Sequence, residues 1–157
     1  MKITIFLIII FLIISSVLNS EEINENIRIE ESVVKAVIFA CGLERQLYEM
    51  NENINTKDQV YQHYLQGYSE DIAFRYANHS WTEYGLKLGD YAAFPPDVVF
   101  VQSVSDERAV AYFETPIVLQ DEESWKALKY TIVELVRKEN KWVITKTERT
   151  NNNPSNN

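Results

Sequence analysis

The feature that most constrains the fold is a pair of β-rich runs near the C-terminus. Residues 129–147 read KYTIVELVRKENKWVITKT, and the polar residues 138–141 separate two runs rich in β-branched and aromatic side chains. Such a pattern is typical of an antiparallel hairpin. With Glu139-Asn140 as a two-residue turn, Leu135 lies opposite Ile144. We therefore expect an antiparallel sheet that the upstream chain must cover.

The two faces of this predicted hairpin differ in chemistry, because side chains along a strand alternate between faces. The face that carries Ile144 is apolar and needs a hydrophobic core. On the other face, the expected register pairs Glu134 with Thr145 and Tyr130 with Arg149, so polar groups stand among apolar ones. We expect this second face to line a cleft or to contact a partner.

Three helices are predicted upstream of the sheet. Apolar residues at helical spacing predict the first over residues 31–50. Thr56 begins the second in a capping box with Gln59, because each side chain can bond the backbone N–H of the other. Gly67 is expected to end this helix as a C-terminal cap, and Ser69 to cap the third helix.

Two further strands are predicted over residues 97–103 and 108–115 from their β-branched and aromatic content. Helices that precede strands predict an α+β domain, with N-terminal helices packed on a curved antiparallel sheet of about four strands.

This order of elements resembles the NTF2-like (cystatin-like) superfamily, which includes small exported bacterial envelope proteins. The likeness rests on the helical corner at residues 67–69 and on the strands DVVFVQS, RAVAYFET, YTIVELVRK and KWVITKT. The resemblance implies a conical cavity between sheet and helices. It implies no single function, since the fold hosts enzymes, carriers and interaction modules. Enzymes of the family place a Tyr with an Asp, or a His with an Asp, in that cavity, and no position here matches such a motif.

The N-terminus has the pattern of a secretory signal. Lys2 supplies a positive start, residues 3–14 are apolar except for Thr4, and the next six residues turn small and polar. Cleavage and retention as an uncleaved anchor both remain open. In either case we expect the working domain to be extracytoplasmic, secreted or anchored at the cell envelope.

The expected organisation therefore has four parts. Residues 1–20 are the signal peptide or signal anchor, and residues 21–30 are an acidic spacer. Residues 31–149 form a single α+β domain, and the polar residues 150–157 form a disordered tail.

Composition excludes several classes of partner and cofactor. The formal net charge is −8 and there is no basic run, so we expect the protein not to bind nucleic acid. We expect contact with a membrane only through residues 1–20, and only if these are uncleaved. Cys41 is the single cysteine, so no internal disulfide forms, and we expect it to be buried. His63 and His79 stand on different predicted helices, so no metal site or cofactor is predicted.

Two functional hypotheses from different classes follow. The first is a non-catalytic module at the cell envelope that binds a small molecule or an envelope protein. The second is a pocket enzyme or carrier of NTF2-like type that uses Tyr and carboxylate chemistry. No catalytic residue is predicted, and a homodimer through the sheet is a further alternative. The candidate ligand- or partner-binding residues are Tyr64, Tyr112, Glu114, Tyr130 and Glu134.

The roles of these candidates depend on their surroundings. Tyr64 belongs to a stripe with Tyr61 and Tyr68, which either forms an aromatic surface for a ligand or packs on the sheet. If Glu114 or Glu134 met a tyrosine in a desolvated cavity, the carboxyl pKa would rise and proton transfer would become feasible. The alternative is that both acids face solvent.

Overall fold

The computed structural model describes residues 2–82, 85–86, 95–115 and 129–156, with side chains omitted for 2–23, 51 and 156. The helices are α1 (Lys2–Glu49), α2 (Lys57–Tyr64), α3 (Glu70–Ser80) and the 3-10 turns Asn51–Asn53 and Pro154–Asn156. The strands are β1 (Trp81–Thr82), β2 (Gly85–Leu86), β3 (Phe100–Val104), β4 (Arg108–Glu114), β5 (Tyr130–Lys138) and β6 (Lys141–Thr150).

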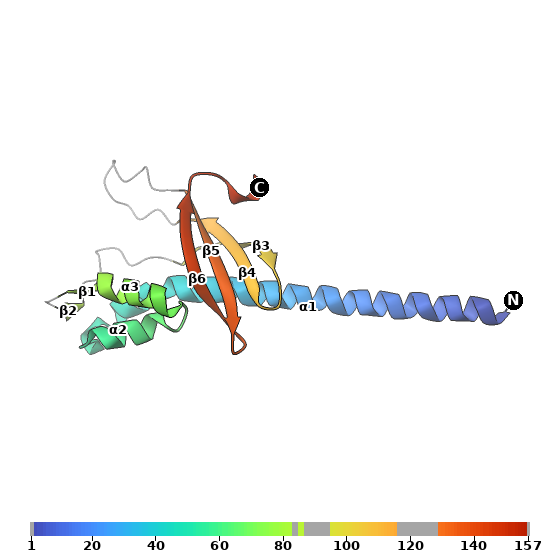
Figure 1. The fold of residues 1–157 in the computed structure, drawn as a ribbon, viewed down its shortest axis with the longest axis horizontal. Helices are drawn as coiled ribbons and strands as arrows, with labels where there is room; N and C mark the ends of the chain where they lie inside the picture. The colour runs from blue at the N-terminus through green and yellow to red at the C-terminus, as the bar shows by residue number, and fades with distance from the viewer. Residues whose placement is uncertain (1, 83–84, 87–94, 116–128, 157) are drawn as a thin grey trace.

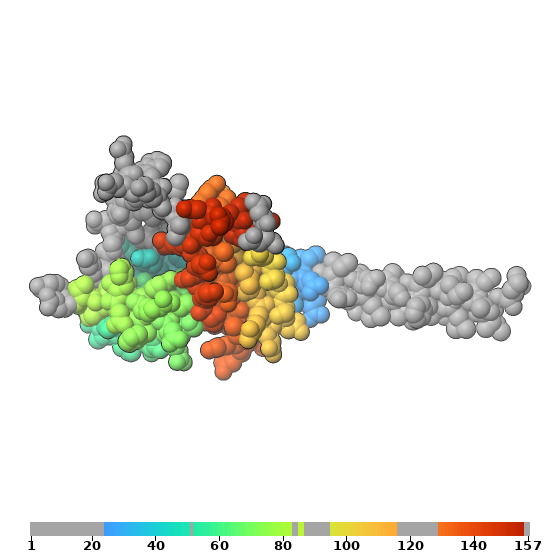
Figure 2. Space-filling view, turned by 45° about the horizontal axis from the view of Figure 1, so that its top comes forward, coloured from blue at the N-terminus to red at the C-terminus, as the bar shows by residue number. Residues whose placement is uncertain are grey.

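The predicted α+β class is confirmed. Strands β3 to β6 form one antiparallel sheet in the order β3-β4-β5-β6, and β1 pairs with β2 in a separate small ribbon. Three helices pack against the four-stranded sheet, and α1 extends well beyond it toward the N-terminus (Figure 1). In the space-filling view α3 adjoins β6, whereas α1 emerges beside β3 (Figure 2). The core joins side chains such as Leu43, Ile72, Leu135 and Ile144, each at most 1% exposed.

The predicted hairpin turn is confirmed. Glu139 and Asn140 connect β5 to β6 with φ of 50° and 64°, the positive values that a type I′ hairpin turn requires. Leu135 pairs with Ile144 as predicted, and both are buried against the helices.

Beyond Ile144, the predicted register is wrong. A β-bulge at this point makes Glu134 pair with Lys146 instead of Thr145, and Tyr130 pair with Thr150 instead of Arg149. The extra residue is Thr145, whose hydroxyl donates to the Glu134 carbonyl oxygen at 3.2 Å.

The bulge changes which side chains face the helices, because one inserted residue reverses the alternation of every residue after it. Lys146 now faces outward, where its Nζ lies 2.7 Å from Glu134 Oε1. Arg149 pairs with Thr131 and lines the helix-covered side, whereas we expected it on the opposite face.

The predicted start of α2 is confirmed. Gln59 N donates to Thr56 Oγ1 at 3.2 Å, and Thr56 N donates to Gln59 Oε1 at 3.0 Å, which completes the capping box. The predicted cap at Gly67 is wrong, since α2 ends at Tyr64 with Leu65 as its cap. Gly67 does not have the positive φ of a glycine cap.

Gly67 is instead the point where the chain after α2 approaches α1 most closely. A Cβ built on Gly67 would lie 2.7 Å from the Cβ and 2.9 Å from the Cα of Ala40. The helical corner of residues 65–69 also bonds to the sheet, because Ser69 N donates to the Ile144 carbonyl at 2.8 Å and Ile144 N donates to the Gly67 carbonyl at 3.0 Å. Ser69 is the N-cap residue of α3, but its side chain makes no capping bond.

Helix α1 runs without a break through residues 21–30, where we expected a spacer. Helix α1 is joined to the sheet at Ser32, whose Oγ accepts a hydrogen bond from the Trp142 indole N–H at 2.9 Å. Val33 is the first fully buried residue of the described part of α1. Among the residues whose side chains the structure describes, no helical stretch is long and apolar enough to cross a bilayer. At the other end, where disorder was predicted, Pro154 is buried at the start of a 3-10 turn.

Candidate functional site

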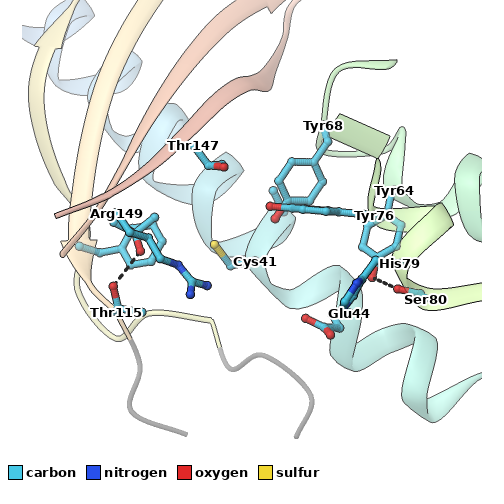
Figure 3. A pocket seen from close by; sticks show the side chains of 13 residues that line it. Cys41, Glu44, Tyr64, Tyr68, Tyr76, His79, Ser80, Thr115, Thr147 and Arg149 are labelled. Atoms are coloured by element: carbon cyan, nitrogen blue, oxygen red, sulfur yellow. Dashed lines mark hydrogen bonds between the residues drawn. The ribbon is translucent and has the colours of Figure 1, made fainter. Parts of the chain in front are cut away.

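A cavity of about 340 Å³ lies between the helices and the inner face of the sheet. Its helix wall is formed by α1, α2, α3 and the α2–α3 corner, and its sheet wall by β4, β5 and β6 with Thr115 (Figure 3). The residues that line it are Ala40, Cys41, Glu44, Tyr64, Tyr68, Tyr76, His79, Ser80, Phe113, Thr115, Thr131, Thr147 and Arg149.

Three tyrosines form the aromatic part of the helix wall. The Tyr64, Tyr68 and Tyr76 rings meet edge to face, with centroids 5.3 Å apart for Tyr64 and Tyr76 and 5.0 Å apart for Tyr68 and Tyr76. This is the favourable geometry for aromatic pairs. Tyr64 and Tyr68 thus pack in the core and also line the cavity, while Tyr61 is half-buried. Core packing is therefore shown for two residues of the stripe, and a ligand-binding role stays a prediction.

Burial keeps the thiol of Cys41 and the tyrosine hydroxyls of this wall protonated. Desolvation raises the pKa of the Cys41 thiol to about 12, and a hydrogen bond with Tyr68 offsets only part of this effect. Desolvation likewise raises the pKa of Tyr64 to about 12, against the opposing hydrogen bond with Ser80, whose Oγ lies 3.3 Å from the Tyr64 hydroxyl. The pKa of Tyr68 is raised well above its usual value. At neutral pH these groups are neutral hydrogen-bond partners and not nucleophiles or bases.

The sheet wall carries hydroxyls and one cation. Thr115 Oγ1 and Thr131 Oγ1 lie 2.8 Å apart, and Thr131 pairs with Arg149 across β5 and β6. Arg149 is exposed to solvent, and among the described residues it has no carboxylate within ion-pair distance. The Arg149 guanidinium and the Glu44 carboxylate extend into the same space from opposite walls (Figure 3).

The structure separates the five predicted site residues. Tyr64 lines the cavity, whereas Tyr112, Glu114 and Tyr130 line an open groove of about 1130 Å³ on the outer side of the sheet. Glu134 belongs to neither and forms an exposed ion pair. Glu114 is also exposed, so both acids face solvent, which was one of our two alternatives, and neither meets Tyr64 in the cavity.

Sequence reasoning missed most of the polar lining. Glu44 and Tyr76 were not among the predicted site residues. Arg149 was placed on the outer face because its inward position depends on the bulge at Thr145, which no local sequence pattern marks.

The histidines divide between the core and the cavity. His63 is 7% exposed, and its Nε2 lies 2.9 Å from the Leu43 carbonyl oxygen. His79 is exposed at the cavity. Within the described part of the chain, no group of three or more His, Cys, Asp or Glu residues could hold a metal ion.

Comparisons with known proteins add no assignment. No family model, curated protein or solved structure matches this chain. The resemblance to the NTF2-like superfamily therefore stays a prediction.

Titration of Cys41 and Tyr64 in the cavity should lower the stability of the fold at alkaline pH. A group whose pKa is raised in the folded state stabilises the fold below its unfolded pKa, and that contribution is lost as the pH rises through the folded value. For Cys41 and Tyr64 the unfolded values are 9.0 and 10.0, and both folded values are about 12. We therefore expect the urea midpoint to fall steadily between pH 9 and pH 12.

The matched variant for this pH series combines Cys41→Ala with Tyr64→Phe. It lacks two of the titrating groups, so its midpoint should fall less over the same range, whatever its stability at pH 8. An equal decline in both proteins would show that these groups do not drive the pH dependence.

Proposed function

We propose that this protein is a non-catalytic binding module that holds a small molecule in the cavity between its helices and its sheet. The observation that carries the proposal is the cavity itself, which combines aromatic walls with a few convergent polar groups. Ligand sites in proteins have this composition and occupy about 300–1,000 Å³, so a cavity of about 340 Å³ suits a small ligand.

The protonated state of Cys41 and Tyr64 supports binding over catalysis by either group. The pKa values of Cys41 and Tyr64 are raised to about 12, so neither supplies a thiolate or phenolate near neutral pH. The hydrogen-bonding partner of the Tyr64 hydroxyl is Ser80 and not a carboxylate. A pocket enzyme, our alternative from the sequence, would need an acid or base held ready for proton transfer.

We place this module outside the cytoplasm. The support is the signal-like pattern of residues 1–20, with an apolar run that follows Lys2. Ser32 joins α1 to the packed domain, so the helical residues 21–31 separate the domain from residues 1–20. At 1.5 Å per residue, such a helix would hold the domain about 17 Å from an anchored segment.

The test is native mass spectrometry of the full chain, isolated from its own cells by fractionation without denaturant. The expected result is a mass above that of the chain, released on denaturation. The denatured mass also shows whether residues 1–20 remain. A bare chain would contradict a retained ligand, and recovery from the cytoplasmic fraction alone would contradict export.

Two neighbouring substitutions locate the bound molecule. Thr147→Phe fills the cavity from the sheet wall, whereas Lys146→Phe adds the same ring on the outer face. We expect the added mass to disappear in Thr147→Phe and to persist in Lys146→Phe.

A bound mass in both variants would favour the second candidate, a partner or ligand in the outer groove. That groove holds three predicted site residues, and it includes the stacked rings of Phe100 and Tyr112, 5.1 Å apart, with Phe100 49% exposed.

A further inference from the structure

We propose that the ligand of the cavity is a small organic acid with a single carboxylate, which pairs with the guanidinium of Arg149. This inference rests on the proposed function and names the class of molecule that the cavity takes.

The first step is the placement of Arg149. The bulge at Thr145 turns Thr147 and Arg149 toward the helix side, and bulges commonly re-aim side chains in this way beside functional sites. Without the bulge, the inward residues would be Lys146 and Glu148, which instead form an exposed ion pair at 3.8 Å on the outer face.

The second step is the chemistry of the sheet wall. The guanidinium presents a planar fork of N–H donors that matches a carboxylate in two parallel hydrogen bonds. The hydroxyls of Thr115, Thr131 and Thr147 line the same cavity, and a hydroxyl can donate to a carboxylate oxygen. No carboxylate among the described residues forms an ion pair with Arg149. Its exposure at the cavity lets an anion reach it without unfolding.

The third step concerns the rest of the ligand. Ala40, Phe113 and the rings of Tyr64, Tyr68 and Tyr76 offer apolar surface to a hydrocarbon or aromatic body. Glu44 faces the same space, and its negative charge helps burial to raise the pKa of Tyr64 and of Tyr68. A second carboxylate at that end would be repelled by Glu44, so the cavity favours a monoanion.

Three probes of nearly equal shape test this assignment by isothermal titration calorimetry: phenylacetate, 2-phenylethanol and phenylmalonate. We expect phenylacetate to bind at least tenfold more tightly than the neutral alcohol and the dianion, since a charge-assisted hydrogen bond contributes about that factor or more. Absence of phenylacetate binding, or equal binding of the alcohol, would overturn the inference.

Variants identify the residue responsible. Arg149→Gln should weaken phenylacetate binding about tenfold or more and leave the weak binding of 2-phenylethanol unchanged. Arg149→Lys should restore part of the loss, because it keeps the charge without the fork. The control is Lys146→Gln, which removes a neighbouring cation from the outer face and should bind like the wild type. Equal effects of Arg149→Gln and Lys146→Gln would show a general charge effect and contradict the pairing.

The two levels of proposal fail separately. A retained mass in native spectra, combined with equal binding of acid and alcohol, would leave the binding module standing and remove only the carboxylate assignment. A bare native chain would contradict the binding module itself.

Discussion

Replacing Leu43 by alanine is expected to lower the free energy of unfolding by about 2–5 kcal/mol. Leu43 is fully buried near the C-terminal end of α1, within the cluster that joins the helices to the sheet. Its truncation removes apolar contacts and leaves a cavity that the surrounding elements can only partly close. The measurement is urea denaturation followed by circular dichroism, with the slope compared between variants.

The matched control is Tyr48→Ala on the same helix. This change deletes a larger apolar side chain, but Tyr48 is 54% exposed. We expect its effect to stay within about 0.5 kcal/mol, as for other surface substitutions. Equal losses at Leu43 and Tyr48 would contradict the assignment of the buried face of α1.

Adding a single methyl group at Gly67 is expected to destabilise the protein by about 1–3 kcal/mol. In Gly67→Ala the new Cβ would lie 2.7 Å from the Ala40 Cβ and 2.9 Å from the Ala40 Cα. Because a backbone atom cannot swing aside as a flexible side chain can, α1 and the α2–α3 corner must move apart. The corner also bonds to Ile144 of β6, so the shift would strain its junction with the sheet.

Gly42→Ala is the opposite case and serves as the control. Gly42 lies within α1, and a Cβ there meets nothing within 4 Å. Alanine is favoured over glycine in a helix by about 1 kcal/mol, so we expect this variant to be more stable than the wild type. If both glycine variants changed stability in the same direction, the close approach at Gly67 would not be the cause.

The Gly67 prediction also bears on the cavity. Ala40 and Tyr68 both line it, and Gly67 directly precedes Tyr68 and packs closely on Ala40. Moving the corner away from α1 would enlarge the cavity at its helix wall, so Gly67→Ala should also weaken the binding of a molecule in the cavity.

Much of the fold follows from local patterns in the sequence. The two-residue turn at Glu139 and Asn140, the capping box of Thr56 with Gln59, and the α+β order of elements were all predicted correctly. These features depend on backbone dihedral preferences, short-range hydrogen bonds and the period of apolar residues. All three are properties of neighbouring residues, so the sequence alone suffices to specify them.

The candidate site follows from tertiary structure. The bulge at Thr145 depends on how β6 packs against β5 and the helices, and it alone turns Arg149 inward. The role of Gly67 comes from the approach of Ala40, 27 positions away in the chain, and not from its own dihedral angles. The sequence by itself determined the hairpin turn, the start of α2 and the order of helices before strands, because those are local. Only the tertiary structure decided which polar side chains meet in the cavity, because that depends on contacts between distant segments.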